Sequence, residues 1–153
     1  MLRFVTRSEA ETMRFAGRLA EMLAAGDTVL LHGDLGAGKS VFARGVARGI
    51  GIQGAMPSPT FTLLIPYEGR CRLYHFDLYR LNDPDEFYAA GLEEFIGGDG
   101  IALVEWPEMA DLEPDRCLDV RIGRGEDMDA RVIEIENRGV AGFAAGALAE
   151  WRI

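Results

Sequence analysis

The segment from Gly33 to Ser40 constrains the fold of this chain more than any other part of the sequence. Its eight residues read Gly-Asp-Leu-Gly-Ala-Gly-Lys-Ser and match the pattern G-x-x-x-x-G-K-[ST]. A short apolar run at residues 28–31 precedes the segment, as expected of a strand buried on both faces. Residues 39–50 follow it with apolar side chains at helical spacing. The order of strand, glycine-rich loop and helix predicts an α/β protein that binds phosphate groups.

Each residue type in this loop has a physical reason. Glycines let the backbone wrap closely around phosphate oxygens, in conformations that a Cβ atom would block. Successive backbone N–H groups then point into one concavity, and the start of the following helix adds its positive dipole end. Lys39 would supply a point charge for the β- and γ-phosphates, and the Ser40 hydroxyl would reach Mg²⁺. The loop therefore predicts a site for ATP or ADP with Mg²⁺; the alternative is a tight turn without a ligand.

The basic residues of the chain support this assignment. The sequence contains 15 arginines and one lysine, so arginine serves wherever a general positive charge is needed. The single lysine, Lys39, stands at the position of the motif where a slender ammonium fits and a planar guanidinium does not.

Two acidic residues follow predicted strands. Glu105 ends the apolar run at 101–104, and Asp77 ends a run that begins at Leu73. Ligands of open α/β sheets collect at the carboxyl ends of the parallel strands, so both carboxylates are candidates for the metal or the attacking water. A solvated acid at a strand end is the alternative for each.

Four further features lie near the predicted site. The segment 58–61, Ser-Pro-Thr-Phe, either senses the γ-phosphate or only begins a strand. His75 lies between two aromatic residues, and we interpret it as a packed structural residue, as we do His32. Trp106 belongs to the core, lies beside the nucleotide or contacts a partner.

The rest of the chain predicts one domain over residues 1–153. The patterns indicate a strand at 2–5, a helix capped by Thr6 or Ser8 and ended by Gly26, strands at 61–67 and 72–78 joined by a turn, a helix from Asp83 to Ala90, an antiparallel pair at 118–122 and 131–136, and a terminal helix at 139–151. We expect a three-layer α/β sandwich of P-loop NTPase type, with a mixed sheet and antiparallel additions.

Composition narrows the function. The formal net charge is -9, so the chain repels phosphate backbones, and extended binding of nucleic acid by this chain alone is not expected. Two cysteines without a CxxC pair or a histidine cluster argue against a zinc site. The sequence contains no signal peptide and no membrane-spanning run, which predicts a cytoplasmic location.

With these segments in place, the chain resembles the TsaE family, the small P-loop ATPase of bacterial tRNA threonylcarbamoyladenosine synthesis. The resemblance rests on the loop at 33–40, Ser-Pro-Thr-Phe-Thr-Leu at 58–63, Tyr-His-Phe-Asp-Leu-Tyr-Arg-Leu at 74–81 and Val-Glu-Trp-Pro-Glu at 104–108. It implies binding of ATP and ADP with Mg²⁺ and slow hydrolysis of ATP. It also implies action with TsaD and TsaB, which modify adenosine-37 of tRNA, so that tRNA is met only through that complex.

The resemblance also implies roles for individual residues. Catalytic or switch roles fall to Lys39, Asp77, Glu105 and Thr60, and metal binding to Ser40 and Glu105. The nucleotide would be contacted by Glu9, Asp34, Leu35, Gly36, Ala37, Gly38, Lys39, Ser40, Val41, Trp106 and Glu108. Ser40 and Val41 stand where the family commonly has two threonines, so the metal-binding hydroxyl is kept while one near the α-phosphate is lost.

Three other functions use the same loop. A small-molecule kinase would need a site for its acceptor, and the arginines here are scattered. A GTPase would need a second lysine to read guanine, which this chain lacks. A nucleotide-dependent binding module without useful hydrolysis differs little in sequence from a slow ATPase.

Overall fold

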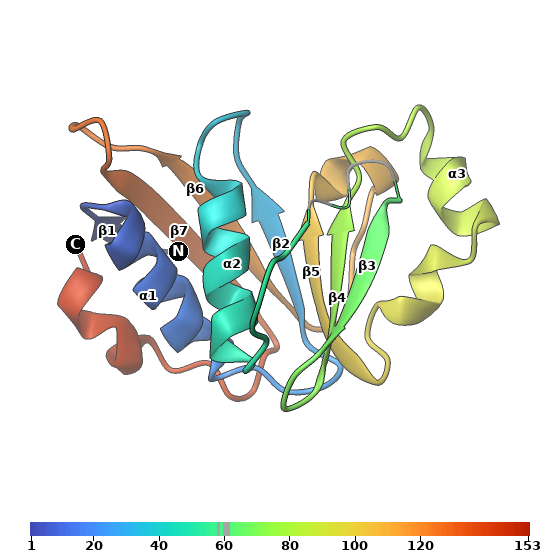
Figure 1. The fold of residues 1–153 in the computed structure, drawn as a ribbon, viewed down its shortest axis with the longest axis horizontal. Helices are drawn as coiled ribbons and strands as arrows, with labels where there is room; N and C mark the ends of the chain where they lie inside the picture. Colours follow the sequence, from blue (N-terminus) through green and yellow to red (C-terminus); the bar gives the residue numbers. More distant parts are fainter. Residues whose placement is uncertain (58, 60–61) are drawn as a thin grey trace.

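The computed structural model describes residues 1–57, 59 and 62–153. Three members of the predicted sensing segment, Ser58, Thr60 and Phe61, therefore lie outside the described residues. Among the described residues the chain forms one seven-stranded sheet with helices on both faces (Figure 1). The strands are β1 (Leu2–Thr6), β2 (Thr28–His32), β3 (Leu64–Glu68), β4 (Arg72–Asp77), β5 (Gly100–Glu105), β6 (Cys117–Arg124) and β7 (Arg131–Arg138). The helices are α1 (Glu9–Ala20), α2 (Lys39–Gly49) and α3 (Pro84–Ala89), with 3₁₀ turns η1 (Leu92–Phe95), η2 (Pro107–Ala110) and η3 (Ala145–Trp151).

The sheet is mixed, with its parallel strands at the centre. The strand order is β1-β7-β6-β2-β5-β4-β3. Strands β6, β2, β5 and β4 pair in parallel, whereas β7, β1 and β3 join antiparallel. The predicted antiparallel pair is confirmed, with Ile122 opposite Ile133. The fully buried β5 and nearly fully buried β2 explain why their sequences are continuous apolar runs.

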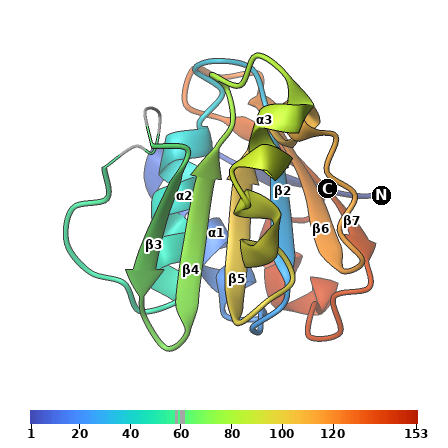
Figure 2. The ribbon, with the colours of Figure 1, turned by 90° about the vertical axis from the view of Figure 1, so that its right-hand side faces the viewer.

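Alternate residues of each central strand face different helical layers. On β2, Leu31 belongs to the core under α1 and α2, while Leu30 belongs to the core under α3. On β5, Leu103 and Val104 divide in the same way. Figure 2 shows α3 and η1 on the opposite side of the sheet from α1 and α2. This arrangement is the predicted three-layer sandwich.

Helices α1 and α2 pack closely because glycines line their contact. A Cβ atom on Gly45 would meet the carbonyl oxygen of Met13 at 2.5 Å, and one on Gly49 would meet that of Gly17 at 2.4 Å. The Ser8 side chain accepts a hydrogen bond from the Glu11 amide and caps α1, as predicted. The helix ends at Ala20, however, and Gly26 lies in the turn that leads into β2, with a φ of 95°. The close contact fixes α2, which carries Lys39 at its first turn.

The predicted terminal helix at 139–151 is wrong. The backbone turns at Gly139, where φ is 90°, and only η3 near the end is helical. A Cβ atom on Gly142 would lie 2.4 Å from the carbonyl oxygen of Met22, so the segment passes directly over the end of α1. It is held by apolar packing, with the Trp151 ring 5.4 Å from that of Phe15. Tertiary contact therefore decides its shape, because the glycines remove helical preference.

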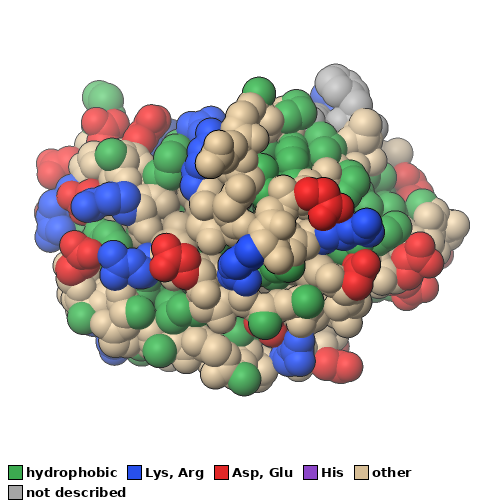
Figure 3. Space-filling model, turned by 60° about the horizontal axis from the view of Figure 1, so that its bottom comes forward, with side chains coloured by type: hydrophobic (Ala, Val, Ile, Leu, Met, Phe, Trp, Pro, Cys, Tyr) green, Lys and Arg blue, Asp and Glu red, His purple; other side chains and the backbone are tan. Residues whose placement is uncertain are grey.

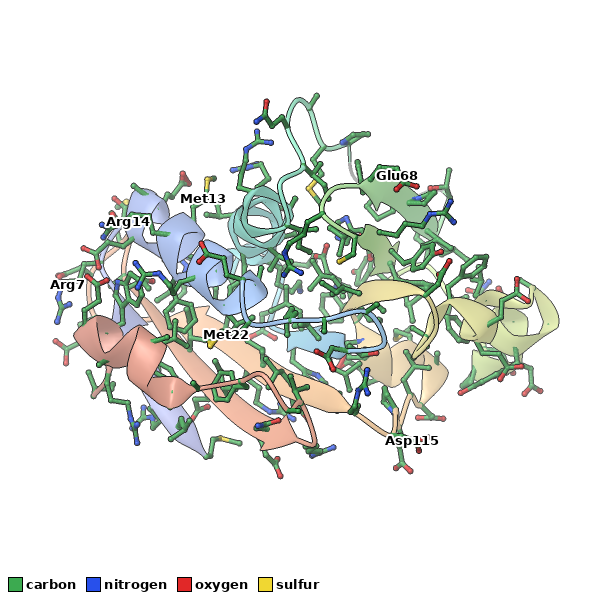
Figure 4. The ribbon with its side chains drawn as sticks, turned by 90° about the horizontal axis from the view of Figure 1, so that it is seen from below. Arg7, Met13, Arg14, Met22, Glu68 and Asp115 are labelled. Carbon is green, nitrogen blue, oxygen red and sulfur yellow. The ribbon has the colours of Figure 1, made fainter. Side chains whose placement is uncertain are left out.

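The end of the molecule away from the Gly33–Ser40 loop shows no concentration of one charge. In Figure 3 acidic and basic side chains lie side by side on that face. Seen from below in Figure 4, Arg7 and Arg14 lie at the outer edge, whereas Met22 lies toward the C-terminal segment, where its sulfur accepts from the Ala144 amide at 3.2 Å. No helix among the described residues is long and apolar enough to cross a membrane.

Candidate active site at the carboxyl ends of the parallel strands

A cleft of about 480 Å³ lies where β2, β4 and β5 end. The loop between β2 and α2 forms one wall and is seen at the top of Figure 1. The cleft is lined by Glu9, Thr12, Asp34, Leu35, Gly36, Gly38, Lys39, Ser40, Val41, Asp77, Tyr79, Arg80, Glu105, Trp106, Asp129 and Arg131. Most residues predicted for the nucleotide therefore share one cleft. Ala37, within the loop, is buried and does not line the cleft, and Glu108 lines a smaller hollow beside it.

The loop has a backbone conformation that suits phosphate binding. Gly36 and Gly38 have φ values of 79° and 108°, in the left-handed region that favours glycine. A Cβ atom on Gly33 would lie 2.7 Å from the carbonyl oxygen of Ile122, so the loop can rest against β6 only without a side chain there. Helix α2 begins at Lys39, and its cap, Gly38, offers no side-chain acceptor. The first N–H groups of α2 are thus available to an anion.

Lys39 is held in the cleft by the loop itself. Its side chain is buried at 7% exposure, and its Nζ atom donates to the carbonyl oxygen of Gly33. The same atom lies 3.8 Å from the centre of the Trp106 ring. Burial lowers the pKa of Lys39 below its usual value. Four carboxylates act against that shift, those of Glu105, Asp77, Glu108 and Asp34. The contacts of the Lys39 ammonium with the Gly33 carbonyl and the Trp106 ring compensate only part of the cost of burying its charge. A bound anion would replace these contacts with a stronger one.

The two candidate acids stand side by side. Asp77 and Glu105 are direct partners in the parallel pairing of β4 and β5. Glu105 is 7% exposed, and Asp77 is half-buried. Burial raises the pKa of Asp77 above its ordinary value, and the charge of Glu105 raises it further, while the amide of Tyr79 donates to it at 3.1 Å and acts the other way. Two adjacent carboxylates of this kind favour a cation between them.

Replacing Asp77 with asparagine should lower the rate of ATP hydrolysis without lowering the stability of the fold. Because the folded pKa of this carboxyl is raised, its ionised form destabilises the fold at neutral pH, and that cost disappears as the pH falls below the ordinary value of 3.8. Asp77→Asn should therefore melt at the same temperature as the wild type or higher at pH 7, and lose any advantage at low pH. Its ATP hydrolysis should fall about 100-fold or more.

Thermal melting from pH 3 to pH 8 and steady-state ATP hydrolysis would measure these two effects. Asp115→Asn, at an exposed position on the far end of the molecule, is the matched control. A variant of Asp77 that was less stable at pH 7 yet hydrolysed ATP normally would contradict the assignment.

Both histidines lie against carboxylates. The Nε2 atom of buried His75 lies 2.6 Å from Oε2 of Glu105. The Nδ1 atom of His32 lies 3.1 Å from Glu108, and its Nε2 lies 3.0 Å from Asp119 without hydrogen-bond alignment. The burial of His75 is compatible with the structural role predicted for it, and the sequence did not indicate its carboxylate partner.

The hairpin of β6 and β7 brings residues to the cleft and to the phosphate loop that the sequence did not indicate. Arg131 donates from Nε to the carbonyl oxygen of Ala37 at 2.6 Å, and Arg124 donates to that of Gly36 at 3.1 Å. Asp129 lines the cleft from the turn between these strands. At the other wall, the ring of Tyr79 lies 4.9 Å from that of Trp106. Alternation predicted the hairpin, but nothing in it indicated that the turn would reach the phosphate loop.

Removing Arg131 should loosen the phosphate loop. Arg131→Leu loses a charged hydrogen bond to Ala37, an interaction of about 1.5–3 kcal/mol, so ADP affinity should fall roughly 10- to 100-fold. Calorimetric titration with ADP would measure it. Arg3→Leu is the control, because Arg3 is exposed on β1 and pairs only at the surface with Glu134. Equal ADP affinity in the two variants would show that the loop keeps its shape without Arg131.

The donors in the cleft suit Mg²⁺. Ser40, Asp77 and Glu105 all line it and offer oxygen atoms, which Mg²⁺ prefers. No group of three or more His, Cys, Asp or Glu side chains that could hold a metal occurs in the described part of the chain. An ion that accompanies ATP needs no such group, because phosphate oxygens and water supply most of its ligands.

The fold and the loop together define an α/β protein of P-loop NTPase type. The family model described as "Threonylcarbamoyl adenosine biosynthesis protein TsaE" matches residues 6–133. The chain therefore belongs to the TsaE family, which has its role in tRNA threonylcarbamoyladenosine biosynthesis.

Curated relatives and a solved structure agree with this membership. The chain is 38% identical to the TsaE protein of Bacillus subtilis over 133 residues, which cover 86% of this chain and 83% of that protein. It is 41% identical to the TsaE protein of Haemophilus influenzae, covering 83% and 84% respectively. The crystal structure of YdiB from Bacillus subtilis superposes with a TM-score of 0.77 at 34% identity, over 97% of this chain and 92% of that one.

Proposed function

We propose that this chain is a Mg²⁺-dependent ATPase that acts with TsaB and TsaD in the threonylcarbamoyl modification of adenosine-37 in tRNA. One observation carries the ATPase proposal. The glycine loop, the buried ammonium of Lys39 and the paired carboxylates of Asp77 and Glu105 line a single cleft at the start of α2. The partner proposal rests on the family's role in this tRNA modification.

The cleft can divide the work of phosphate chemistry among its residues. The loop amides and the start of α2 would hold the β- and γ-phosphates, with Lys39 moving from the Gly33 carbonyl to a phosphate oxygen. Ser40 and Glu105 would hold Mg²⁺, which neutralises charge that develops between the phosphates. Asp77, beside Glu105, would orient the attacking water.

The rim of the cleft suits a dependence on partner proteins. Leu35 is 68% exposed on the loop, and Tyr79 is 46% exposed beside Trp106. Apolar and aromatic side chains of this kind are typical of protein contacts. A partner placed there would cover the mouth of the cleft and exclude water from it. Because the net charge is -9, this chain repels the phosphate backbone of tRNA, and the partners would bind the tRNA.

Steady-state ATP hydrolysis tests this function most simply. The purified chain should hydrolyse ATP slowly with Mg²⁺, and addition of TsaB and TsaD should raise the rate. Lys39→Ala would serve as the blank in both conditions. Consumption of ATP only with an added metabolite would favour a small-molecule kinase, which transfers the phosphoryl group to that acceptor, and an unchanged rate with the pair would contradict the partnership.

A further inference from the structure

His75 lies on the same face of the sheet as the two candidate acids. It precedes Asp77 by two residues on β4, so both side chains point toward α2. In the pairing of β4 with β5, His75 is opposite Leu103 and Asp77 is opposite Glu105. His75 and Glu105 are therefore diagonal neighbours on one face, close enough for their side chains to meet.

The contact between them is specific. Nε2 of His75 lies 2.6 Å from Oε2 of Glu105, and both side chains are buried. A carboxylate only accepts hydrogen bonds, so the imidazole donates from Nε2. Its Nδ1 atom has no hydrogen-bond partner among the described residues. The hydrogen bond that this side chain makes within the described protein is thus directed to Glu105.

Packing alone does not account for an imidazole here. Around it, the same face of β4 and β5 carries Leu73, Ile101 and Leu103, all fully buried. An aliphatic side chain at position 75 would fill this core without burying polar nitrogen atoms. His75 is 4% exposed, so its polar atoms leave water, and the hydrogen bond to Glu105 is what compensates for that loss.

We propose that His75 is a positioning residue that holds the Glu105 carboxylate in the orientation that Mg²⁺ binding requires. The inference rests on the proposed function, because it takes Glu105 as the acid on the metal side. Fixing Oε2 removes rotamer freedom from Glu105 and leaves Oε1 for another partner. Replacing a residue that orients a metal ligand in this way commonly lowers the affinity for the metal.

Two amide variants isolate the hydrogen bond. The side-chain nitrogen of glutamine reaches the position of histidine Nε2, whereas that of asparagine is one methylene too short. His75→Gln should therefore keep the donor to Glu105, and His75→Asn should lose it, while both place an amide in the same core. Thermal melting of the two variants checks that they fold alike.

The readout is the gain in ADP affinity that Mg²⁺ confers, measured by calorimetry with Mg²⁺ and again with EDTA. The wild type and His75→Gln should show similar gains. In His75→Asn the gain in ADP affinity from Mg²⁺ should be about tenfold smaller, while ADP affinity in EDTA stays unchanged. In a Glu105→Ala background, His75→Asn should change the gain no further.

The opposite results are distinct. Equal Mg²⁺ gains in His75→Gln and His75→Asn, or a further loss in the Glu105→Ala background, would overturn the positioning role while leaving the proposed function intact. A wild-type protein that bound ADP with no gain from Mg²⁺ would overturn the proposed function and this inference with it.

Discussion

Lys39→Ala should weaken ATP binding by roughly 100-fold or more, because two charged hydrogen bonds that the ammonium would donate to phosphate should contribute about 1.5–3 kcal/mol each. The free protein should keep its melting temperature or gain slightly. Burial lowers the pKa of Lys39, so the charged side chain destabilises the fold at neutral pH, and this cost diminishes as the pH rises toward 10.5. Calorimetric titration with ATP and Mg²⁺, together with thermal melting, would measure both effects.

Lys39→Arg is the matched control for charge. It keeps a cation but places a planar guanidinium behind the glycine loop, where Nζ of Lys39 now meets the Gly33 carbonyl. ATP affinity should fall in this variant as well, which would separate the shape of the site from its charge. Tight binding of ATP by Lys39→Ala would contradict the assignment of the phosphate loop.

Glu105→Gln should abolish most hydrolysis while leaving nucleotide binding without metal nearly intact. The substitution keeps the size of a fully packed side chain but removes the negative charge that would face Mg²⁺. The catalytic rate at saturating ATP should fall about 100-fold, the lower end of what a positioned carboxylate contributes. ADP affinity in EDTA should match the wild type.

Glu68→Gln controls for the loss of one acidic charge, because Glu68 lies exposed at the end of β3 and pairs with Arg72. Its hydrolysis rate should equal that of the wild type. A Glu105→Gln variant with full activity would remove this residue from the mechanism and leave Asp77 as the remaining acid of the pair.

Features encoded locally were predictable from the sequence. The loop from Gly33 to Ser40 is contiguous, and its glycines specify its backbone conformation. The carboxylates of Asp77 and Glu105 followed from a general rule, because parallel strands end at the same edge of a sheet. The start of β3 at Leu64 and the end of α1 at Ala20 differ from the predicted boundaries at residue 61 and at Gly26, because local patterns specify the ends of elements less closely than their centres.

Features that depend on long-range pairing were not predictable. Arg131 reaches Ala37 across 94 positions, and only the order of β7, β6 and β2 in the sheet brings the two together. The hydrogen bond of His75 to Glu105 depends on the register of β4 and β5, which no local pattern specifies. The C-terminal segment packs by Trp151 against α1, and this contact, which the helix predicted at 139–151 did not anticipate, decides its path.

The number of tRNA molecules modified per TsaB–TsaD complex tests the central claim most directly. The reaction would contain tRNA in excess, the threonylcarbamoyl donor, ATP and either the wild-type chain or Glu105→Gln. With the wild type we expect many tRNA molecules to be modified per TsaB–TsaD complex. With Glu105→Gln we expect at most one modified tRNA per complex, or the same yield as in a reaction without this chain. Equal yields with the two proteins would contradict the claim that ATP hydrolysis in this cleft supports the modification.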